Sequence, residues 1–281
     1  MVSVGYVVGQ KNLLKQIDWM CDAKCFPRFS ILVGENGDQE KQIAFHVVDK
    51  LMTLVYELPD NKIDNVRDMI EQSYKIHNSC VYIIPSGDDM SVAAKNALLK
   101  VTEEPPNNAY FIMMLNDPNN TLDTIRSRAT IFTMEPYSKK DLLDYVVRAY
   151  DENSEIYLDL GNTPSEIDML YHMGAEDFYE YVKKVVENIA VASGANSFKI
   201  ADKVAIKDEN GYDLKMFWKA CIKLFFEHLN DRRYDDKENA YYPYLKAAQV
   251  TSDAIKKLSI KGVNKQMLFD EWIIAVRGAL R

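Results

Sequence analysis

Short, uninterrupted apolar runs alternate with longer segments of helical periodicity in the N-terminal half of the chain. The apolar runs predict buried strands at residues 29–33, 80–84, 110–115 and 130–134. The segments between them predict helices at 38–52, 61–77 and 91–104. Continuous hydrophobic strands that are separated by helices are typical of a parallel sheet with both faces covered. The first half of the chain is therefore predicted to be an α/β domain.

The strand pattern stops after about residue 136, and the rest of the chain has the pattern of helices. These are predicted at 138–150, 163–172, 175–193, 197–206, 212–230, 240–258 and 264–280. A change from alternating strands and helices to continuous helix suggests separate domains. We therefore expect three domains: an α/β core over residues 1–138, a small helical unit over 139–175 and an all-helical domain over 176–281. Aromatic side chains between residues 212 and 281 are expected to form the core of the last domain.

Charge narrows the classes of function. The 281 residues carry 34 basic and 42 acidic side chains, which gives a net charge of −8. Non-specific affinity for DNA comes from neutralising phosphates with Lys and Arg, so this chain is not expected to grip DNA by itself. It can still contribute one face to a complex whose other members are basic.

Several features that the sequence lacks bear on the expected compartment and on metal binding. It has no apolar run of about 18 residues, and its first residues lack the basic and apolar regions of a signal peptide. We therefore expect a cytoplasmic protein without membrane contact. Four cysteines are too few and too scattered for a disulfide framework, and Cys21 and Cys25 have no second Cys pair downstream, so no metal site is expected.

A glycine turn follows the first predicted strand and opens the next predicted helix, which is where a P-loop occurs. Its sequence is Gly34-Glu-Asn-Gly37-Asp-Gln-Glu-Lys41. When it is aligned with G-x-x-G-x-G-K-T, Gly34 and Gly37 fit the pattern. At the next positions Gln39 replaces a glycine and Glu40 stands where the phosphate-binding lysine is needed. Lys41 replaces the hydroxyl that binds magnesium.

Glu40 reverses the sign of the interaction with phosphate. One charge pair at about 4 Å is worth roughly 1 kcal/mol in water and about 4 kcal/mol at the effective dielectric of a partly buried site. Losing one attraction and gaining one repulsion weakens triphosphate binding by several kcal/mol, or roughly 10³-fold or more. Lys41 lies about 100° further around the helix, so it is a poor substitute. We therefore expect no nucleotide cofactor at this loop.

The strand at 80–84 also ends without the expected acids. A magnesium-dependent NTPase usually ends this strand with adjacent carboxylates for the metal and the attacking water. Here those places hold Pro85 and Ser86. Asp88 and Asp89 follow in the loop, and we expect them to be solvated acids before a helix N-terminus, where the dipole favours negative charge.

Three motifs in a fixed order carry a resemblance to a known family. They are the run MSVAAKNALLKVTEEPP at 90–106, a strand that ends at Asn116, and the run TIRSRA at 124–129. Bacterial clamp-loader subunits of the AAA+ class carry NALLKxLEEPP, a strand ending in Asn, and TIRSRC at this spacing. The chain resembles them over residues 5–136. The resemblance implies a RecA-like AAA+ core with a parallel sheet, followed by a small helical lid and an all-helical C-terminal collar domain.

The resemblance also implies a role for the Ser-Arg pair. In the family, the arginine of the Ser-Arg-Cys motif reaches ATP bound in the neighbouring subunit and stabilises charge during phosphoryl transfer. Ser127 and Arg128 match the motif, and Ala129 replaces its cysteine. Arg128 is therefore expected to be an arginine finger that acts in trans, and a surface ion pair is the alternative. Arg126 is expected to be a structural salt-bridge partner.

Other positions at which the family handles ATP are changed. Asn116 stands at the sensor-one place, but no arginine occurs near 161–166, where sensor two is expected. The four-cysteine zinc module of many members is missing, because only residues 46–79 lie between the glycine turn and the next buried strand. Together with Glu40 and Pro85, these changes predict a chain without intrinsic ATPase activity.

We therefore expect a non-hydrolysing structural subunit of a clamp-loader complex. The resemblance implies that it assembles with other loader subunits through its collar and AAA+ faces. It would reach the ATP of the adjacent subunit directly, and the sliding clamp and primed DNA through the complex. Two alternatives are kept: an ATP-hydrolysing motor subunit with a divergent site that uses Lys41 and Asp88, and an AAA+-like adaptor outside replication.

Overall fold

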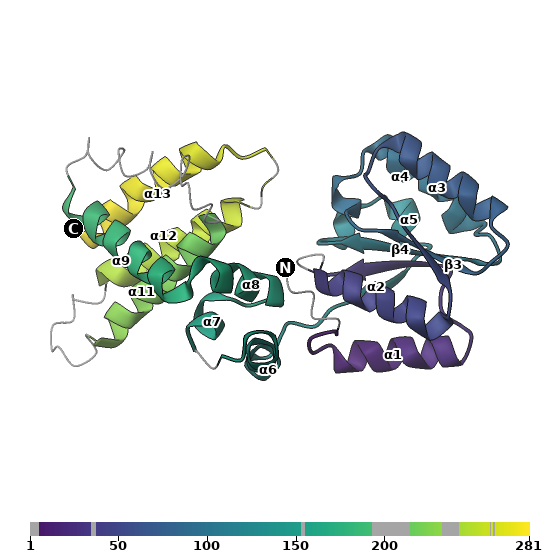
Figure 1. The fold of residues 1–281 in the computed structure, drawn as a ribbon. Coiled ribbons are helices and arrows are strands. Elements are labelled where there is room, and N and C mark those ends of the chain that lie inside the picture. The colour runs from purple at the N-terminus through teal and green to yellow at the C-terminus, as the bar shows by residue number, and fades with distance from the viewer. Residues whose placement is uncertain are drawn as a thin grey trace. The chain divides into compact units, whose positions relative to one another are not determined.

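The chain forms two compact units, Met1–Tyr145 and Val146–Arg281, and each is described by itself. The computed structural model describes residues 6–34, 38–152, 155–192, 214–231, 242–258, 260 and 262–281. Figure 1 shows a sheet flanked by helices in the first unit and helices throughout the described parts of the second. The finer division into domains at 1–138, 139–175 and 176–281 stays a prediction.

The first unit is built on a five-stranded sheet with the strand order β2-β3-β4-β1-β5. Its strands are β1 (Phe29–Val33), β2 (Leu54–Glu57), β3 (Cys80–Ile84), β4 (Ala109–Leu115) and β5 (Thr130–Thr133). Every neighbouring pair is parallel. The predicted α/β class with a parallel sheet is therefore confirmed.

Helices cover both faces of this sheet (Figure 1). One face carries α1 (Lys11–Asp22) and α2 (Asp38–Leu51), and the other carries α3 (Ile63–Lys75), α4 (Val92–Glu103) and the single turn α5 (Asp123–Arg126). Successive residues of a strand point to opposite faces. Accordingly, Ile31 packs in the cluster that contains α3 and α4, whereas Leu32 packs in the cluster that contains α1 and α2. Two buried faces explain why the strand sequences are continuously apolar.

β2 and α1 of the first unit were not predicted, and each omission has a physical reason. β2 is an edge strand whose Leu54 and Val55 are exposed, so it has no buried apolar run. α1 buries Leu13, Ile17 and Cys21, which recur every four residues. This helical spacing contains no continuous apolar run, so a search for such runs does not find it.

The second unit is helical in all its described parts. It contains α7 (Glu155–Leu160), α8 (Pro164–Met173), α9 (Ala175–Val191), α11 (Leu214–Asp231), α12 (Tyr242–Leu258) and α13 (Lys265–Leu280), while α6 (Lys139–Tyr150) spans the boundary between the units. The short α7 was not expected from the sequence. The predicted helix at 197–206 lies outside the described residues.

Aromatic side chains form the core between α11 and α13. Trp218, Phe269 and Trp272 are all nearly inaccessible to solvent, and the Phe269 and Trp272 ring centroids lie 5.2 Å apart. The expectation of an aromatic core is therefore confirmed for these residues. It is wrong for Phe226, which is half exposed because it lies on the outer side of α11.

Candidate functional site

The residues singled out in the sequence gather at one edge of the sheet of the first unit. They lie in the segments that follow β1, β3 and β4, and just after α5. Because the carboxyl ends of parallel strands meet at a common edge, these segments are neighbours in space. The site therefore depends on which of their side chains contact one another.

Gly34 and Glu40 lie in close contact at the end of β1. The Gly34 N–H donates a hydrogen bond to the Leu115 carbonyl at 3.0 Å, which fixes the start of the turn to β4. Glu40 is only 2% exposed, and a Cβ added at Gly34 would lie 2.0 Å from its Oε1. Glycine at position 34 therefore leaves the space that this carboxylate occupies. Gly37 lies outside the described residues.

Gln39 and Lys41, the neighbours of Glu40, also make contacts within the fold. The Val8 N–H donates a buried hydrogen bond to Gln39 Oε1 at 2.8 Å. The Lys41 ammonium forms an ion pair with Glu57 at 2.7 Å, which ties α2 to the edge strand β2. All three positions that differ from the P-loop pattern thus have partners or close neighbours inside this unit.

The end of β3 offers no carboxylate. Pro85 and Ser86 follow Ile84, and the Ser86 carbonyl accepts hydrogen bonds from Asn61 Nδ2 at 2.7 Å and from the Asp89 N–H at 3.2 Å. These residues turn the chain into the short 3₁₀ helix η1 (Gly87–Asp89). Where adjacent acids would stand in a magnesium-dependent NTPase, this chain has a turn.

Asp88 binds the loop that follows β4. Its Oδ2 accepts a hydrogen bond from the Asn116 N–H at 2.7 Å, and its Oδ1 accepts from Asn120 Nδ2 at 2.7 Å and from the Asp117 N–H at 3.4 Å. The expectation of a solvated acid is therefore wrong for Asp88, although Asp89 is exposed. The donors lie 28 to 32 residues away in the sequence, so no local pattern could reveal them.

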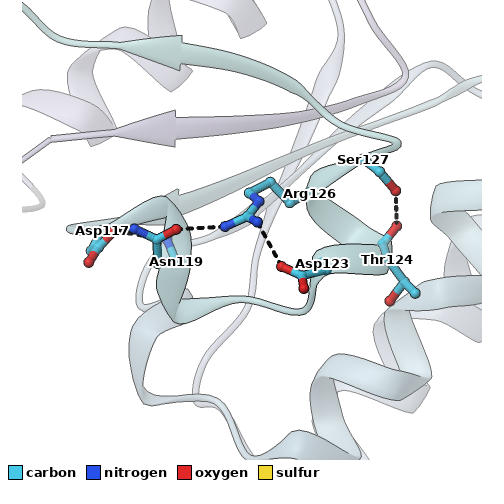
Figure 2. A network of polar contacts seen from close by, with 6 residues as sticks. All are labelled: Asp117, Asn119, Asp123, Thr124, Arg126 and Ser127. Carbon is cyan, nitrogen blue, oxygen red and sulfur yellow. Dashed lines mark hydrogen bonds and ion pairs between the residues drawn. The ribbon is translucent and has the colours of Figure 1, made fainter.

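Arg126 connects the same loop to α5. Its Nη1 donates to Asn119 Oδ1 at 2.6 Å and its Nη2 pairs with Asp123 Oδ1 at 2.7 Å, as Figure 2 shows. The predicted structural role of Arg126 is thus confirmed. In the same view, the Ser127 hydroxyl donates to the Thr124 carbonyl at 3.2 Å.

Arg128 lies at the surface and forms an ion pair. Its Nη1 donates to the Thr124 carbonyl at 2.8 Å, and its Nη2 lies 2.9 Å from Glu103 Oε1 at the end of α4. The side chains of Arg128 and Glu103 are 40% and 53% exposed, and a pair this accessible contributes only about 0–1 kcal/mol. The surface ion pair that was the alternative for Arg128 is present, and its bond to Glu103 is weak enough to exchange. Ala129 packs against the core, as a small residue can.

Glu103 and Asn119 are among the residues of the site that carried no expectation from the sequence. Glu103 lies within the run that matches the family, but no charge partner for it is visible there. Asn119 lies in the short 3₁₀ helix η2 (Pro118–Asn120), where Asp117 Oδ1 accepts a hydrogen bond from its N–H at 2.8 Å. Glu103 contacts Arg128 and Asn119 contacts Arg126, because the fold brings α5 and the residues after it close to both.

The described parts of the chain contain neither a metal-binding group nor a membrane-spanning helix. There, no three His, Cys, Asp or Glu side chains are grouped so that they could hold a metal ion. Within the same ranges, no helix combines the length and apolar character needed to cross a bilayer.

Sequence comparison relates the chain to subunits of DNA polymerase III. Residues 38–138 match the profile of the family described as DNA polymerase III, delta subunit. The delta' subunit of Pseudomonas aeruginosa is 28% identical over 144 residues, which are 47% of this chain and 44% of that protein. The delta' subunit of Buchnera aphidicola (subsp. Baizongia pistaciae) is 29% identical over 86 residues, which are 31% and 26% of the two chains. The chain thus spans less than half the length of these relatives.

Solved structures show the fold. A DNA polymerase III gamma subunit-related protein from Thermotoga maritima aligns with a TM-score of 0.53 and 15% identity, over 96% of this chain and 100% of that chain. The RuvB Holliday junction branch migration motor of the same organism aligns with a TM-score of 0.50 and 19% identity, over 80% of each chain. At these identities the likeness concerns the fold alone, an α/β core followed by helices. The sequence matches to DNA polymerase III subunits confirm the likeness expected from the three motifs.

Proposed function

We propose that this chain, a relative of the clamp-loader subunits of bacterial DNA polymerase III, is a structural subunit of delta' type that hydrolyses no ATP itself. In this proposal it presents Arg128 to ATP held by a neighbouring ATPase subunit. Through the assembled loader it takes part in opening a sliding clamp and placing it on primed DNA. This function implies a cytoplasmic site of action.

One observation carries the proposal. The positions of Gln39, Glu40 and Lys41, where a P-loop would bind phosphate and magnesium, are each engaged inside the fold. A buried carboxylate beside Gly34 repels a triphosphate, and the strand end at Pro85 and Ser86 supplies no metal ligand. The side chains present do not fit a bound magnesium nucleotide.

The exposed position of Arg128 supports the second half of the proposal. A guanidinium is always charged and can pair with two phosphate oxygens at once. Its contact with Glu103 is partly solvated, so a phosphate of a neighbouring subunit competes with it at little cost. The same side chain can therefore rest on Glu103 in the free chain and move to a ligand in the complex.

The other parts of the loader function rest on the family resemblance. We propose that residues 139–175 form the lid and that residues 176–281 form the collar domain that joins this subunit to the others. No cofactor or metal is assigned to the chain. Its contacts with clamp and DNA are assigned to the assembled complex.

The experiment that tests the finger is a substitution of Arg128 in the assembled loader. We expect Arg128→Ala to leave folding and assembly intact and to lower the DNA-stimulated ATPase rate by about 10²-fold or more. Arg67→Ala is the matched control, because Arg67 is an exposed arginine of the same unit with only a 3.8 Å contact to Asp64. A normal ATPase rate in Arg128→Ala would remove the finger role.

The contacts of Lys41 and Asp88 argue against the alternative of an ATP-hydrolysing motor subunit. It needs Lys41 and Asp88 to bind phosphate and metal, but Lys41 is paired with Glu57 and Asp88 accepts hydrogen bonds from the loop after β4. Titration of the isolated chain with ATP and magnesium distinguishes the two functions. Micromolar, magnesium-dependent binding would favour the motor.

The alternative of an adaptor outside replication is tested by co-purification. It predicts that no loader subunits are recovered with the tagged chain.

A further inference from the structure

A continuous path of polar contacts runs from the loop after β3 to the arginine proposed as the finger. It begins at Asp88, whose carboxylate accepts hydrogen bonds from the backbone of Asn116 and the side chain of Asn120. These two donors bracket the segment 116–120. One carboxylate therefore holds both ends of the loop that follows β4.

Further hydrogen bonds connect the 116–120 loop to α5. Asp117 Oδ1 accepts from both the backbone and the side-chain nitrogen of Asn119, at 2.8 and 2.9 Å, which orients the Asn119 amide. The oxygen of that amide accepts from Arg126, which also binds Asp123 in the first turn of α5 (Figure 2). Because a guanidinium is a rigid fork, its two bonds fix the distance between the loop and the helix.

α5 in turn sets the place of Arg128. The Arg128 N–H donates to the Ile125 carbonyl at 3.1 Å, and Ile125 is fully buried. The Arg128 guanidinium donates to the Thr124 carbonyl of the same helical turn. A shift of α5 would therefore move both the backbone and the guanidinium of Arg128.

We propose that Asp88 is a positioning residue for Arg128. This inference rests on the proposed finger function. The Asp88 carboxylate fixes the 116–120 loop, the loop fixes α5 through Arg126, and α5 presents Arg128 at a constant place. A subunit that binds no nucleotide of its own needs such an internal anchor, because no ligand can order the loop. Asp89, one residue further on, is exposed and makes none of these contacts with the loop.

The first test uses the isolated full chain and does not depend on ATP. Hydrogen exchange is measured by mass spectrometry for Asp88→Ala and for the matched control Asp89→Ala. We expect Asp88→Ala to speed amide exchange in residues 116–128 by about 10-fold or more, because their anchoring bonds are lost. Exchange in β1 should not change, and Asp89→Ala should behave as the unaltered chain. Unchanged exchange at 116–128 would overturn the inference.

The second test uses the assembled loader. Since a small misplacement of a catalytic group can cost up to about 10²-fold in rate, we expect Asp88→Ala to lower kcat of the ATPase by roughly 10-fold. The KM for ATP should change little, because in this proposal Asp88 acts through the loop and α5 and does not touch the nucleotide. Asp88→Asn keeps one acceptor oxygen, so it should recover part of the rate. Arg126→Gln cuts the path at another point and should lower kcat in the same way.

The outcomes separate this inference from the function on which it rests. If Arg128→Ala is slow but Asp88→Ala and Arg126→Gln have normal kcat, the positioning role is wrong and the finger stands. If Arg128→Ala has a normal rate, the finger itself is wrong. Should Asp88→Ala fail to fold, as thermal unfolding would reveal, Arg126→Gln decides, because this side chain is 36% exposed and no part of the core.

Discussion

Glu40 shows how a single residue determines what the glycine turn after β1 can accommodate. Its carboxylate lies against the Cα of Gly34, in the space that a side chain at position 34 would occupy. The need for glycine here comes from close packing. The loss of stability on replacing Gly34 should therefore depend on the size of the side chain at position 40.

We expect Gly34→Ala to destabilise the chain by about 1–3 kcal/mol, because the added methyl group overlaps Glu40 and Met134. The double variant Gly34→Ala, Glu40→Ala should lose less than the sum of the two single losses, because the clash with Glu40 is removed. Urea unfolding of the full chain measures these differences.

Gly278→Ala is the control for this series. An added Cβ there would have no atom within 4 Å, and Gly278 lies inside α13, so alanine should stabilise the helix by about 0.5–1 kcal/mol. Equal losses for Gly34→Ala in the presence and absence of Glu40 would contradict the packing argument.

The sequence predicts which residues occupy the site but not what they contact. The identities of Glu40, Pro85 and Arg128 are enough to suggest a chain that lacks its own nucleotide and retains an arginine. The partners Gln39–Val8, Lys41–Glu57 and Asp88–Asn116 join residues 16 to 31 positions apart. Such pairs are set by the tertiary fold, so local motif reasoning could not reach them.

At the scale of elements, buried charges connect the helices of the second unit. Glu166 in the first turn of α8 is 9% exposed and accepts two hydrogen bonds from Lys219 of α11, at 2.6 and 2.7 Å. It also accepts from the Asn162 N–H at 2.8 Å, which satisfies a free donor at the helix start. This one carboxylate therefore stabilises a helix end and a helix pair together.

We expect Lys219→Ala to lower the free energy of unfolding by about 2–4 kcal/mol, because it leaves the buried Glu166 without its closest cation. Lys215, at 3.8 Å, compensates only in part. Lys256→Ala is the control, since its pair with Asp253 is largely exposed and should be worth less than about 0.5 kcal/mol. Guanidinium unfolding of the three chains is the measurement, and similar losses at both positions would refute the difference.

A second polar cluster makes stability depend on pH. Burial raises the pKa of Glu227, but hydrogen bonds from Lys223 and Tyr179 outweigh it, so the pKa lies below its usual 4.5. A carboxylate with a lowered pKa adds stability above its ordinary pKa and loses it as the pH falls through the lowered value. The cluster should therefore stabilise α9 and α11 at neutral pH and fail in acid.

We expect Glu227→Gln to reduce the dependence of the unfolding free energy on pH below about pH 4.5, the usual value for this carboxyl. At neutral pH the variant should be the less stable chain, and the difference should shrink as the pH falls. Unfolding curves between about pH 3 and 7 measure this. Glu187→Gln, at an exposed position of α9, should leave the pH dependence as it is.

The elements themselves follow from apolar spacing to a large extent. Both buried faces of β1 were visible as the run from Phe29 to Val33, and the predicted helix at 91–104 matches α4, which Ser91 caps by accepting a hydrogen bond from the Ala94 N–H at its Oγ. β2 was not predicted in this way, because its apolar run, Leu54 to Tyr56, is only three residues long and ends at Glu57, which is shorter than the runs of the buried strands.

At the scale of the whole molecule, charge limits what the chain can do alone. Its net charge of −8 at neutral pH opposes the approach of a polyanion. The cations of the described site are engaged: Lys41 with Glu57, Arg126 with Asp123 and Arg128 with Glu103. The isolated chain should therefore bind DNA only weakly.

We expect the isolated chain to bind duplex or primed DNA with a Kd weaker than about 10⁻⁴ M at roughly 0.15 M salt. Fluorescence anisotropy with a labelled primed template measures this, and the assembled loader is the positive control. Micromolar binding by the isolated chain, with a steep dependence on salt, would contradict the charge argument.

The contacts of the glycine turn also oppose any change toward a phosphate-binding sequence. Glycine at position 39 would release the N–H of Val8, and lysine at position 40 would press a buried ammonium against Gly34. A hydroxyl at position 41 would take the lysine partner from Glu57. Each of these changes costs stability before a phosphate site is complete. Conversion of this turn into a nucleotide site therefore needs several substitutions at once, and the single ones should be recovered only as destabilised chains.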